Sequence, residues 1–123
     1  VHQYYVVSIP TFVQPACEEA LRYDNSADVA LFRRRRDYVY AALTEMGLAV
    51  EKPEGAFYAF VDIRRFGMDS LTFCTRMLKE GLVAAVPGCY FGGEGFMRIS
   101  YCYSDEALKE GLDRVARFIH TLE

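Results

Sequence analysis

The sequence of 123 residues predicts a single α+β layered domain, in which helices pack on a small mixed sheet. Two observations support this fold class. Segments with apolar residues at spacings of three and four alternate with short apolar runs bounded by Gly and Pro. Hydrophobic residues make up 52% of the chain, including nine Phe and nine Tyr, which is enough for one core. We expect helices in residues 1–47, and the sheet with its packing helices in residues 48–123.

Two helices are expected before the sheet. In TFVQPACEEALR, residues 11–22, apolar residues recur at helical spacing, and Pro15 falls in the first turn, where proline is tolerated. A second helix is expected from Asp28 to Gly47, because glycine suits the left-handed position that ends many helices. The apolar stripe of this second helix is Val29, Phe32, Val39, Leu43 and Met46.

Four strands are expected after these helices. Residues 48–52 predict an edge strand before a Pro-Glu-Gly turn. The next run, AFYAFVDI at residues 56–63, is apolar on both faces, which is typical of a central strand covered on both sides. LVAAV, residues 82–86, predicts a brief strand that the following Pro-Gly pair stops. The last strand is FMRISYC, residues 96–102.

Two more helices alternate with these strands. Asp69 or Ser70 suits the N-cap of a helix that runs through Glu80 and ends at Gly81. Ser104, followed by two acidic residues, begins the final helix. The final helix has an unbroken apolar stripe at 4-3-4-3 spacing, formed by Leu108, Leu112, Val115, Ile119 and Leu122.

Composition and charge exclude several classes of partner. The formal net charge of −3 lacks the positive field that binding to nucleic-acid phosphates requires. No apolar run approaches the roughly 20 residues of a membrane span, and no signal peptide is evident, so a cytoplasmic location with reduced thiols is expected. The cysteines form no Cys-x-x-Cys pair, and His2 and His120 lie at opposite ends, so a zinc site is not expected. The cysteines are Cys17, Cys74, Cys89 and Cys102.

Arg98 lies in the middle of the last predicted strand. Side chains alternate across a strand, so its apolar residues share a face suited to the final helix and Arg98 points to the other face. Ser100 and Cys102 leave room beside it for a planar anion, and a guanidinium matches a carboxylate with a fixed fork of donors. The pattern alone favours a structural salt bridge or an edge-strand charge that discourages aggregation. The apolar face consists of Met97, Ile99 and Tyr101.

Two other motifs suggest anion binding without meeting its requirements. The run RRRR, residues 33–36, sweeps most of the way around a helix and cannot form one face. Only Arg36 falls within the apolar stripe, where we expect it to pair with a carboxylate or to extend into solvent. The glycines of residues 88–95 lack the Lys-Ser or Lys-Thr of a phosphate loop, and Glu94 would repel a phosphate. No Ser-His-Asp or Cys-His arrangement is present.

Four stretches match one family in order: HQYYVVSIPTFVQPACEEAL, PEGAFYAFVDI, MLKEGLVAAVPGCYFG and GEGFMRISYCYSDEALKEGLDRVARF. The chain thereby resembles the C-terminal part of a fold-type I, pyridoxal-phosphate-dependent aminotransferase of class I/II, in the aspartate aminotransferase superfamily. The resemblance covers nearly the whole chain. It implies the small C-terminal domain of that fold, and transfer of an amino group between an amino acid and a 2-oxo acid.

The resemblance also implies roles for individual residues. The arginine of the family's R-I-S strand matches Arg98 and binds the α-carboxylate of the substrate. The segment GCYFG matches the lining of the substrate entrance, where Phe91 would help to shape the pocket. Gly55 and Phe57 match a structural turn and strand of the small domain, and Arg36 matches a basic run that we expect to be structural.

The resemblance places the cofactor site outside this chain. The family's Schiff-base lysine and its other cofactor-binding residues precede the position of Val1, and Lys52, Lys79 and Lys109 match none of them. We therefore expect pyridoxal 5′-phosphate in the full-length protein, none bound to this fragment, and no activity of the fragment alone. The expected partners are an upstream large domain of the same chain and, as is usual in the family, a second subunit.

Two alternatives stay open. The superfamily includes lyases, synthases and transcriptional regulators, so the resemblance leaves these activities open beside amino-group transfer. A freestanding, non-catalytic α+β module that binds a small anion at Arg98, or mediates assembly, is the alternative from a different class. The chain begins without methionine and runs directly into the apolar VHQYYVVSIPTF, which favours a piece of a longer protein.

Overall fold

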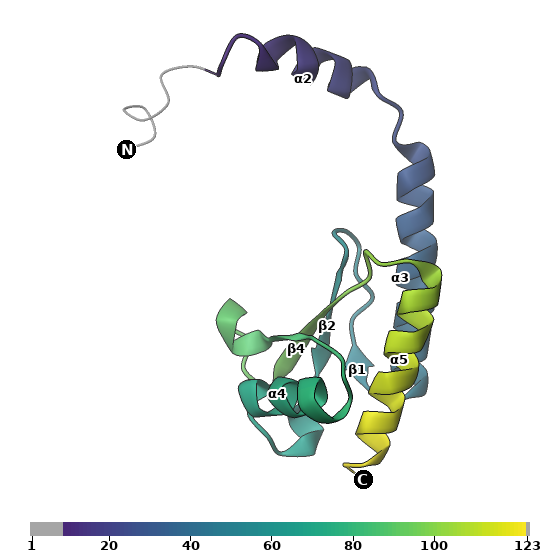
Figure 1. The fold of residues 1–123 in the computed structure, drawn as a ribbon, viewed down its shortest axis with the longest axis vertical. Coiled ribbons are helices and arrows are strands. Elements are labelled where there is room, and N and C mark those ends of the chain that lie inside the picture. The colour runs from purple at the N-terminus through teal and green to yellow at the C-terminus, as the bar shows by residue number, and fades with distance from the viewer. Residues whose placement is uncertain (1–8, 123) are drawn as a thin grey trace.

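The computed structural model describes residues 9–122 (Figure 1). Residues 1–8, with His2 and most of the apolar N-terminal run, and residue 123 lie outside the described part. The α-helices are α2 (Val13–Arg22), α3 (Ser26–Glu45), α4 (Ser70–Glu80) and α5 (Asp105–His120). The strands are β1 (Ala49–Val50), β2 (Tyr58–Asp62), β3 (Val86–Pro87) and β4 (Phe96–Ser100), with short 3-10 turns η1 (Arg64–Phe66) and η2 (Gly88–Phe91). The predicted α+β class is confirmed.

The strands form one sheet in the order β1-β2-β4-β3, and each neighbouring pair is antiparallel. The prediction of a mixed sheet was wrong in this respect. In a sequence, a helix between two strands favours a parallel pairing of those strands. Here the order is β2, α4 and β3. β2 and β3 do run in the same direction, but β4 lies between them and is antiparallel to both.

The predicted helix ends agree closely with the structure. Asp69 is the N-cap of α4, because its Oδ1 accepts a hydrogen bond from the backbone N–H of Thr72 at 2.8 Å. Ser104 caps α5 in the same way, through the N–H of Ala107 at 3.2 Å. Gly47 follows α3 with a φ of 72°, as expected for a left-handed terminating residue. Helix α3 begins at Ser26, two residues before the predicted start.

The strand predicted at residues 82–86 is displaced toward the C-terminus. Leu82 has a φ of 55° and is exposed, and the N–H of Val83 donates to the carbonyl of Met77 at 3.3 Å. These residues therefore close the end of α4 and do not enter the sheet. Pairing with β4 begins only at Val86 and includes Pro87, opposite Met97.

The core lies on one face of the sheet. Ala59 and Val61 of β2 and Met97 of β4 face the helices α3, α4 and α5 and are almost fully buried. β2 is a central strand, as predicted, but the described residues cover only one of its faces, because Phe60 on the other face is 38% exposed. The helices contribute Val39, Leu43, Phe73, Cys74, Met77, Leu108, Leu112, Val115, Phe118 and Ile119 to the core.

Helix α2 lies apart from the sheet and its packing helices (Figure 1). It contains no buried residue, and Phe12 just before it and Leu21 within it are 81% and 88% exposed. Helix α5 lies along the C-terminal part of α3 (Figure 1). In the described part of the chain, no helix combines the length and apolar character that crossing a membrane requires.

Candidate functional site

Arg98 projects from the middle of β4 onto the open face of the sheet. Its neighbours Met97 and Ile99 point the opposite way, toward the core, which confirms the predicted alternation. Arg98 pairs with Phe60 of β2 on one side and with Val86 of β3 on the other. The side chain is half-buried, although it lies outside the apolar core. The site that follows is therefore built on the sheet and not on a terminal segment.

Two aromatic rings hold the guanidinium of Arg98. Its Cζ atom lies 4.2 Å from the ring centroid of Tyr58 and 4.1 Å from that of Phe91, both within the range of cation–π attraction. Stacking of this kind orients the guanidinium plane without using its N–H groups. Within residues 9–122, the Arg98 side chain forms no hydrogen bond or ion pair, so its donors remain available to an anion. We call Arg98, Tyr58 and Phe91 the Arg98 site.

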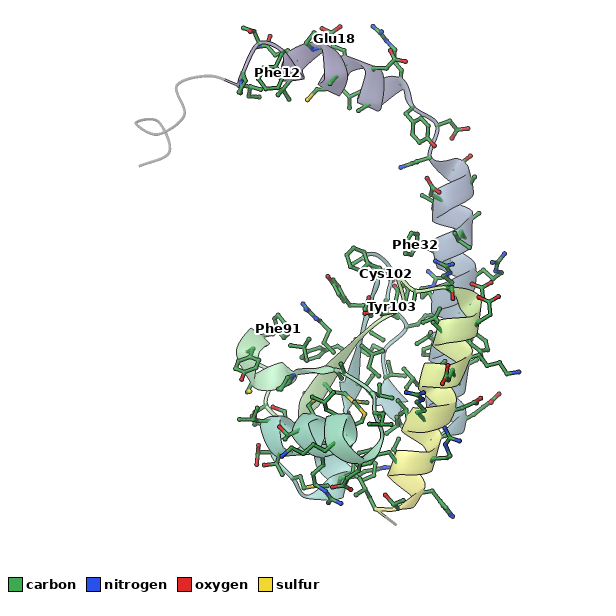
Figure 2. All side chains as sticks on the ribbon, viewed as in Figure 1. Phe12, Glu18, Phe32, Phe91, Cys102 and Tyr103 are labelled. Carbon is green, nitrogen blue, oxygen red and sulfur yellow. The ribbon has the colours of Figure 1, made fainter. Side chains whose placement is uncertain are left out.

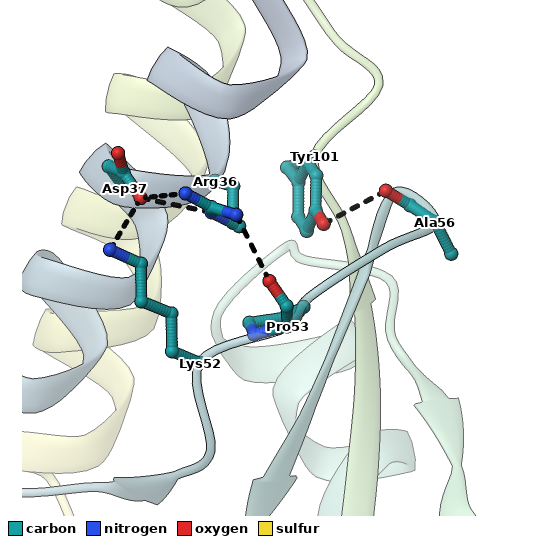
Figure 3. Close-up of polar contacts among 6 residues, drawn as sticks. All are labelled: Arg36, Asp37, Lys52, Pro53, Ala56 and Tyr101. Carbon is teal, nitrogen blue, oxygen red and sulfur yellow. Dashed lines mark hydrogen bonds and ion pairs between the residues drawn. The ribbon is translucent and has the colours of Figure 1, made fainter. Parts of the chain in front are cut away.

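The turn before Tyr58 is fixed from both sides (Figure 3). The Nη1 atom of Arg36 donates to the carbonyl of Pro53 at 3.3 Å, and the hydroxyl of Tyr101 donates to the carbonyl of Ala56 at 3.0 Å. Ala56 has a φ of 58°, an uncommon conformation for a residue with a Cβ, so it needs such support. Burial raises the pKa of Tyr101, which keeps its hydroxyl protonated as a donor.

Arg36 also pairs with a carboxylate, which is one of the two outcomes expected from the sequence. Its Nε and Nη2 atoms lie 2.9 and 2.8 Å from Oδ1 of Asp37, and Lys52 lies 2.8 Å from the same oxygen (Figure 3). The hydrogen bond from Lys52, followed by that from Arg36, lowers the pKa of Asp37. The carboxylate therefore stays ionised, and Arg36 is held in place to bind the turn.

The other arginines of the RRRR run do not form an anion site. Arg34 and Arg35 bind the two carboxylate oxygens of Asp105 at 2.8 and 2.9 Å, which joins α3 to the start of α5. Those contacts, with Arg35 first, lower the pKa of Asp105. Arg36 points elsewhere, so the run does not form one face, as its spread around the helix predicted.

Phe91 belongs to a loop that lies next to α4 (Figure 2). The loop, residues 88–95, contains η2 and leads into β4. Glu94 accepts hydrogen bonds from Ser70 at the start of α4 and from the N–H of Gly95. These bonds, with the one from the Ser70 N–H first, lower the pKa of Glu94. An ionised carboxylate thus occupies the helix N-terminus, where it would repel a phosphate.

The family model for aminotransferase class I and II matches residues 1–115 of the chain. The chain belongs to this family. A probable N-acetyl-LL-diaminopimelate aminotransferase of Bacillus subtilis (strain 168) is 44% identical over 126 residues, covering 97% of this chain and 32% of the relative. An aspartate aminotransferase of Thermotoga maritima is 42% identical over 113 residues, covering 92% of this chain and 29% of the relative.

Solved structures of class I and II aminotransferases have the same fold. The crystal structure of aspartate aminotransferase from Thermotoga maritima matches with a TM-score of 0.87 at 42% identity, covering 96% of this chain and 31% of that one. Aromatic aminotransferase from Pyrococcus horikoshii OT3 matches with a TM-score of 0.85 at 41% identity, covering 98% and 35%. The chain spans about a third of the length of these relatives and matches the C-terminal part of their fold.

The Arg98 site of this aminotransferase chain does not by itself fit the family's cofactor, pyridoxal 5′-phosphate. Such a cofactor is held by a lysine Schiff base. Lys52 is paired with Asp37, while Lys79 lies in α4 and Lys109 in α5, so none comes from the elements that form the site. Within the described residues, no group of His, Cys, Asp and Glu side chains could hold a metal ion. The site presents a cation between aromatic rings, which suits binding of a small anion.

The sequence predicted Arg98 and Phe91 but missed Tyr58. The structure brings the two predicted residues together and adds Tyr58 as the second ring. Tyr58 pairs with Ser100, so it is a diagonal neighbour of Arg98 on the same face of the sheet. Tyr58 is next to the buried Ala59 in the strand, so strand alternation could have placed Tyr58 on the open face of the sheet. The register between β2 and β4, which the sequence leaves open, was needed to bring it next to Arg98.

Proposed function

We propose that this chain is the C-terminal part of a pyridoxal-phosphate-dependent aminotransferase that transfers an amino group between an amino acid and a 2-oxo acid. Within that enzyme, Arg98 binds the α-carboxylate of the substrate. The proposal extends from the family membership of the chain and from the described relatives, which are aminotransferases. The rest of the polypeptide would supply the cofactor site and a large domain, and two subunits would form the enzyme.

One observation carries the role of Arg98. Its guanidinium is oriented by Tyr58 and Phe91, while its N–H donors have no acceptor among the described residues. A structural arginine would be expected to donate hydrogen bonds to a carboxylate or a carbonyl, as Arg36 does. A planar carboxylate matches the free fork with two parallel hydrogen bonds. The salt-bridge interpretation of the sequence pattern therefore loses its support here.

The residues of this chain would contribute binding and orientation to the reaction. Arg98 fixes the carboxylate, which restricts the rotation of the substrate and sets the direction of its Cα–H bond. The rings of Tyr58 and Phe91 keep water from the faces of the guanidinium, which strengthens its attraction to an anion. The cofactor, when bound, supplies the electron sink for the amino-group transfer. No proton-transfer group of the reaction is assigned to this chain.

The test uses the complete polypeptide that carries this chain. L-Aspartate and L-phenylalanine are suitable donors, with 2-oxoglutarate as acceptor, because relatives are named for aspartate and aromatic amino acids. We expect Arg98→Ala to reduce kcat/KM by about 10²-fold. This factor corresponds to the loss of one charged, bidentate interaction of about 3 kcal/mol. KM should rise, and the absorbance of the bound cofactor should be unchanged.

Arg64→Ala is the matched control. Arg64 also stacks on a ring of the same open face, with its Cζ 5.3 Å from the ring centroid of Phe96, but Asp62 already pairs with its guanidinium. The Arg64→Ala variant should keep kcat/KM within about twofold of the unsubstituted protein, as surface substitutions usually do. A second comparison uses phenethylamine, which lacks the carboxylate, against L-phenylalanine. If Arg98→Ala weakens both ligands equally, or weakens neither, Arg98 does not bind the carboxylate.

A further inference from the structure

The loop that carries Phe91 is attached to the first residues of α4 by a group of hydrogen bonds. The backbone N–H of Ser70 donates to Oε1 of Glu94 at 2.6 Å, and its hydroxyl lies 3.1 Å from Oε2. The same hydroxyl accepts from the backbone N–H of Cys89 at 3.2 Å. Ser70 is fully buried, whereas Glu94 is exposed, so these bonds are shielded from water on the serine side. One serine side chain thus contacts the loop at both of its ends.

Glu94 completes the start of α4 from outside the helix. Asp69 caps this helix through Thr72, as an ordinary N-cap does. The N–H of Ser70 is another of the unpaired donors at the helix start, and the Glu94 carboxylate satisfies it. Because Glu94 also accepts from Gly95, the loop backbone and the helix end are joined through a single carboxylate.

The loop has little freedom of its own between these contacts. The N–H of Gly93 donates to the carbonyl of Gly88 at 3.0 Å, which closes η2 into a tight turn. A Cβ at Gly88 would overlap the carbonyl oxygens of Gly93 and Phe96, so the backbone segments pass too closely for any side chain. A shift of the loop against α4 would therefore move η2, and Phe91 with it, as one piece.

We propose that Ser70 and Glu94 are positioning residues that hold Phe91 on the guanidinium of Arg98. This inference rests on the proposed function of Arg98 and extends it to residues that contact neither the arginine nor its anion. Helix α4 is anchored in the core by Phe73 and Met77, so it provides a fixed reference for the loop. Without the Glu94 contacts, the hydrogen bond from Cys89 to the Ser70 hydroxyl is the remaining one of these bonds to α4, and Phe91 leaves the guanidinium for part of the time.

The hydrogen bonds, and not the charge of Glu94, carry this role. Both backbone donors, the N–H groups of Ser70 and Gly95, approach the same oxygen, Oε1. The amide oxygen of a glutamine can accept both of them, and its amide nitrogen can donate to the Ser70 hydroxyl. Glu94→Gln should therefore retain the position of the loop, while Glu94→Ala removes every one of the bonds.

The experiment is a double-mutant cycle in the complete polypeptide, with L-aspartate and L-phenylalanine as donors. We expect Phe91→Ala to raise KM about 3- to 10-fold, the range of a partly buried cation–π contact. Glu94→Ala should raise KM by a similar factor, Glu94→Gln by less than twofold. In the Phe91→Ala background, Glu94→Ala should add little, because the residue through which it acts is already absent.

Asp69→Ala is the matched control, because it removes a cap from the same helix start without contacting the loop. It should lower the melting temperature and leave KM unchanged. If Glu94→Ala prevents folding, Ser70→Ala replaces it in the cycle. Additive effects of Glu94 and Phe91 would overturn the positioning role while the role of Arg98 stands. An unchanged KM of Arg98→Ala would instead overturn the proposed function itself.

Discussion

At the residue scale, Arg98 differs from the other arginines of the fold in what surrounds its charge. Arg36 and Arg76 bind carboxylates, and Arg34 with Arg35 shares Asp105. A carboxylate beside Arg98 would compete with any anionic ligand for the same donors. Aromatic rings attract the cation through their faces without occupying the N–H groups, and so orient the side chain while leaving its binding capacity free.

Tyr58 should contribute to this orientation through its ring and not through its hydroxyl. Tyr58→Leu removes the ring 4.2 Å from the Arg98 Cζ atom, and we expect KM for the amino acid to rise about 3- to 10-fold, with a smaller effect on kcat. Tyr58→Phe keeps the ring and should stay within about twofold of the natural protein. Steady-state kinetics on the complete polypeptide measures both. Equal effects of the two substitutions would contradict a role in stacking.

The sequence was most informative about residues whose position depends on local geometry. Strand alternation was enough to predict that Arg98 faces away from the core, and the resemblance to a family singled it out from an ordinary salt bridge. Tyr58 lies 40 positions earlier in the chain, and its contact with Arg98 depends on the pairing of β2 with β4. Such register is decided by the packing of the whole sheet, so a single sequence does not reveal it.

At the scale of elements, the RRRR run of α3 shows how neighbouring residues of one type serve different contacts. Arg34 and Arg35 join α3 to α5 through an exposed carboxylate, Asp105, an arrangement of small energetic weight. Arg36 is more enclosed, with 20% of its side chain exposed, and binds the turn that leads into β2. Its position in the apolar stripe of the helix predicted this difference.

Arg36→Ala should therefore disturb both stability and the site. It leaves the Pro53 carbonyl without its donor and removes two bonds to Asp37, so we expect a loss of about 1–2 kcal/mol in the free energy of unfolding. A modest rise in KM should accompany it, because the turn positions Tyr58. Arg33→Ala, on the exposed side of the same run, should change stability by less than about 0.5 kcal/mol. Urea denaturation compares them, and equal losses would refute the argument.

Element ends were more predictable from the sequence than strand pairing. Capping residues such as Asp69 and Ser104 act on backbone groups two or three positions away, so the local sequence contains the whole signal. The direction of the strands depended on β4, which enters the sheet between β2 and β3 from the C-terminal side of the chain. The strand expected at residues 82–86 does not form over its whole length for a related reason. Its first residues close the C-terminal end of α4 and so do not pair with β4.

At the scale of the whole molecule, the described chain has one buried face and one open face. The open face carries Arg98 and the stacked rings of Phe60 and Phe96, whose centroids are 5.1 Å apart. Leu21 of helix α2 and Phe12 just before the helix are further apolar side chains that the described part leaves exposed (Figure 2 labels Phe12). Under the proposed function, the remaining polypeptide lies against these surfaces, which would enclose Arg98 and strengthen its attraction to a carboxylate.

The buried thiol of Cys74 couples the stability of the whole fold to alkaline pH. Cys74 lies in the core, 4% exposed, and desolvation there raises its pKa from 9.0 to about 11. Between these values the unfolded chain has lost the proton that the folded chain retains. The contribution of the protonated thiol to the free energy of unfolding is therefore present in full below pH 9. It is lost as the pH rises toward 11.

We expect the free energy of unfolding to fall by about 1.4 kcal/mol per pH unit above pH 9 on account of this one group. Cys74→Ala removes the titration and leaves a small cavity, so it should lower stability by a constant amount below pH 9. Above pH 9 the difference between the two proteins should shrink, because only the natural one loses the thiol contribution. Urea denaturation from pH 7 to 10 under reducing conditions measures both curves. Parallel curves across this range would mean that the thiol ionises as readily in the folded chain as in the unfolded one, and that α4 does not shield Cys74 from water.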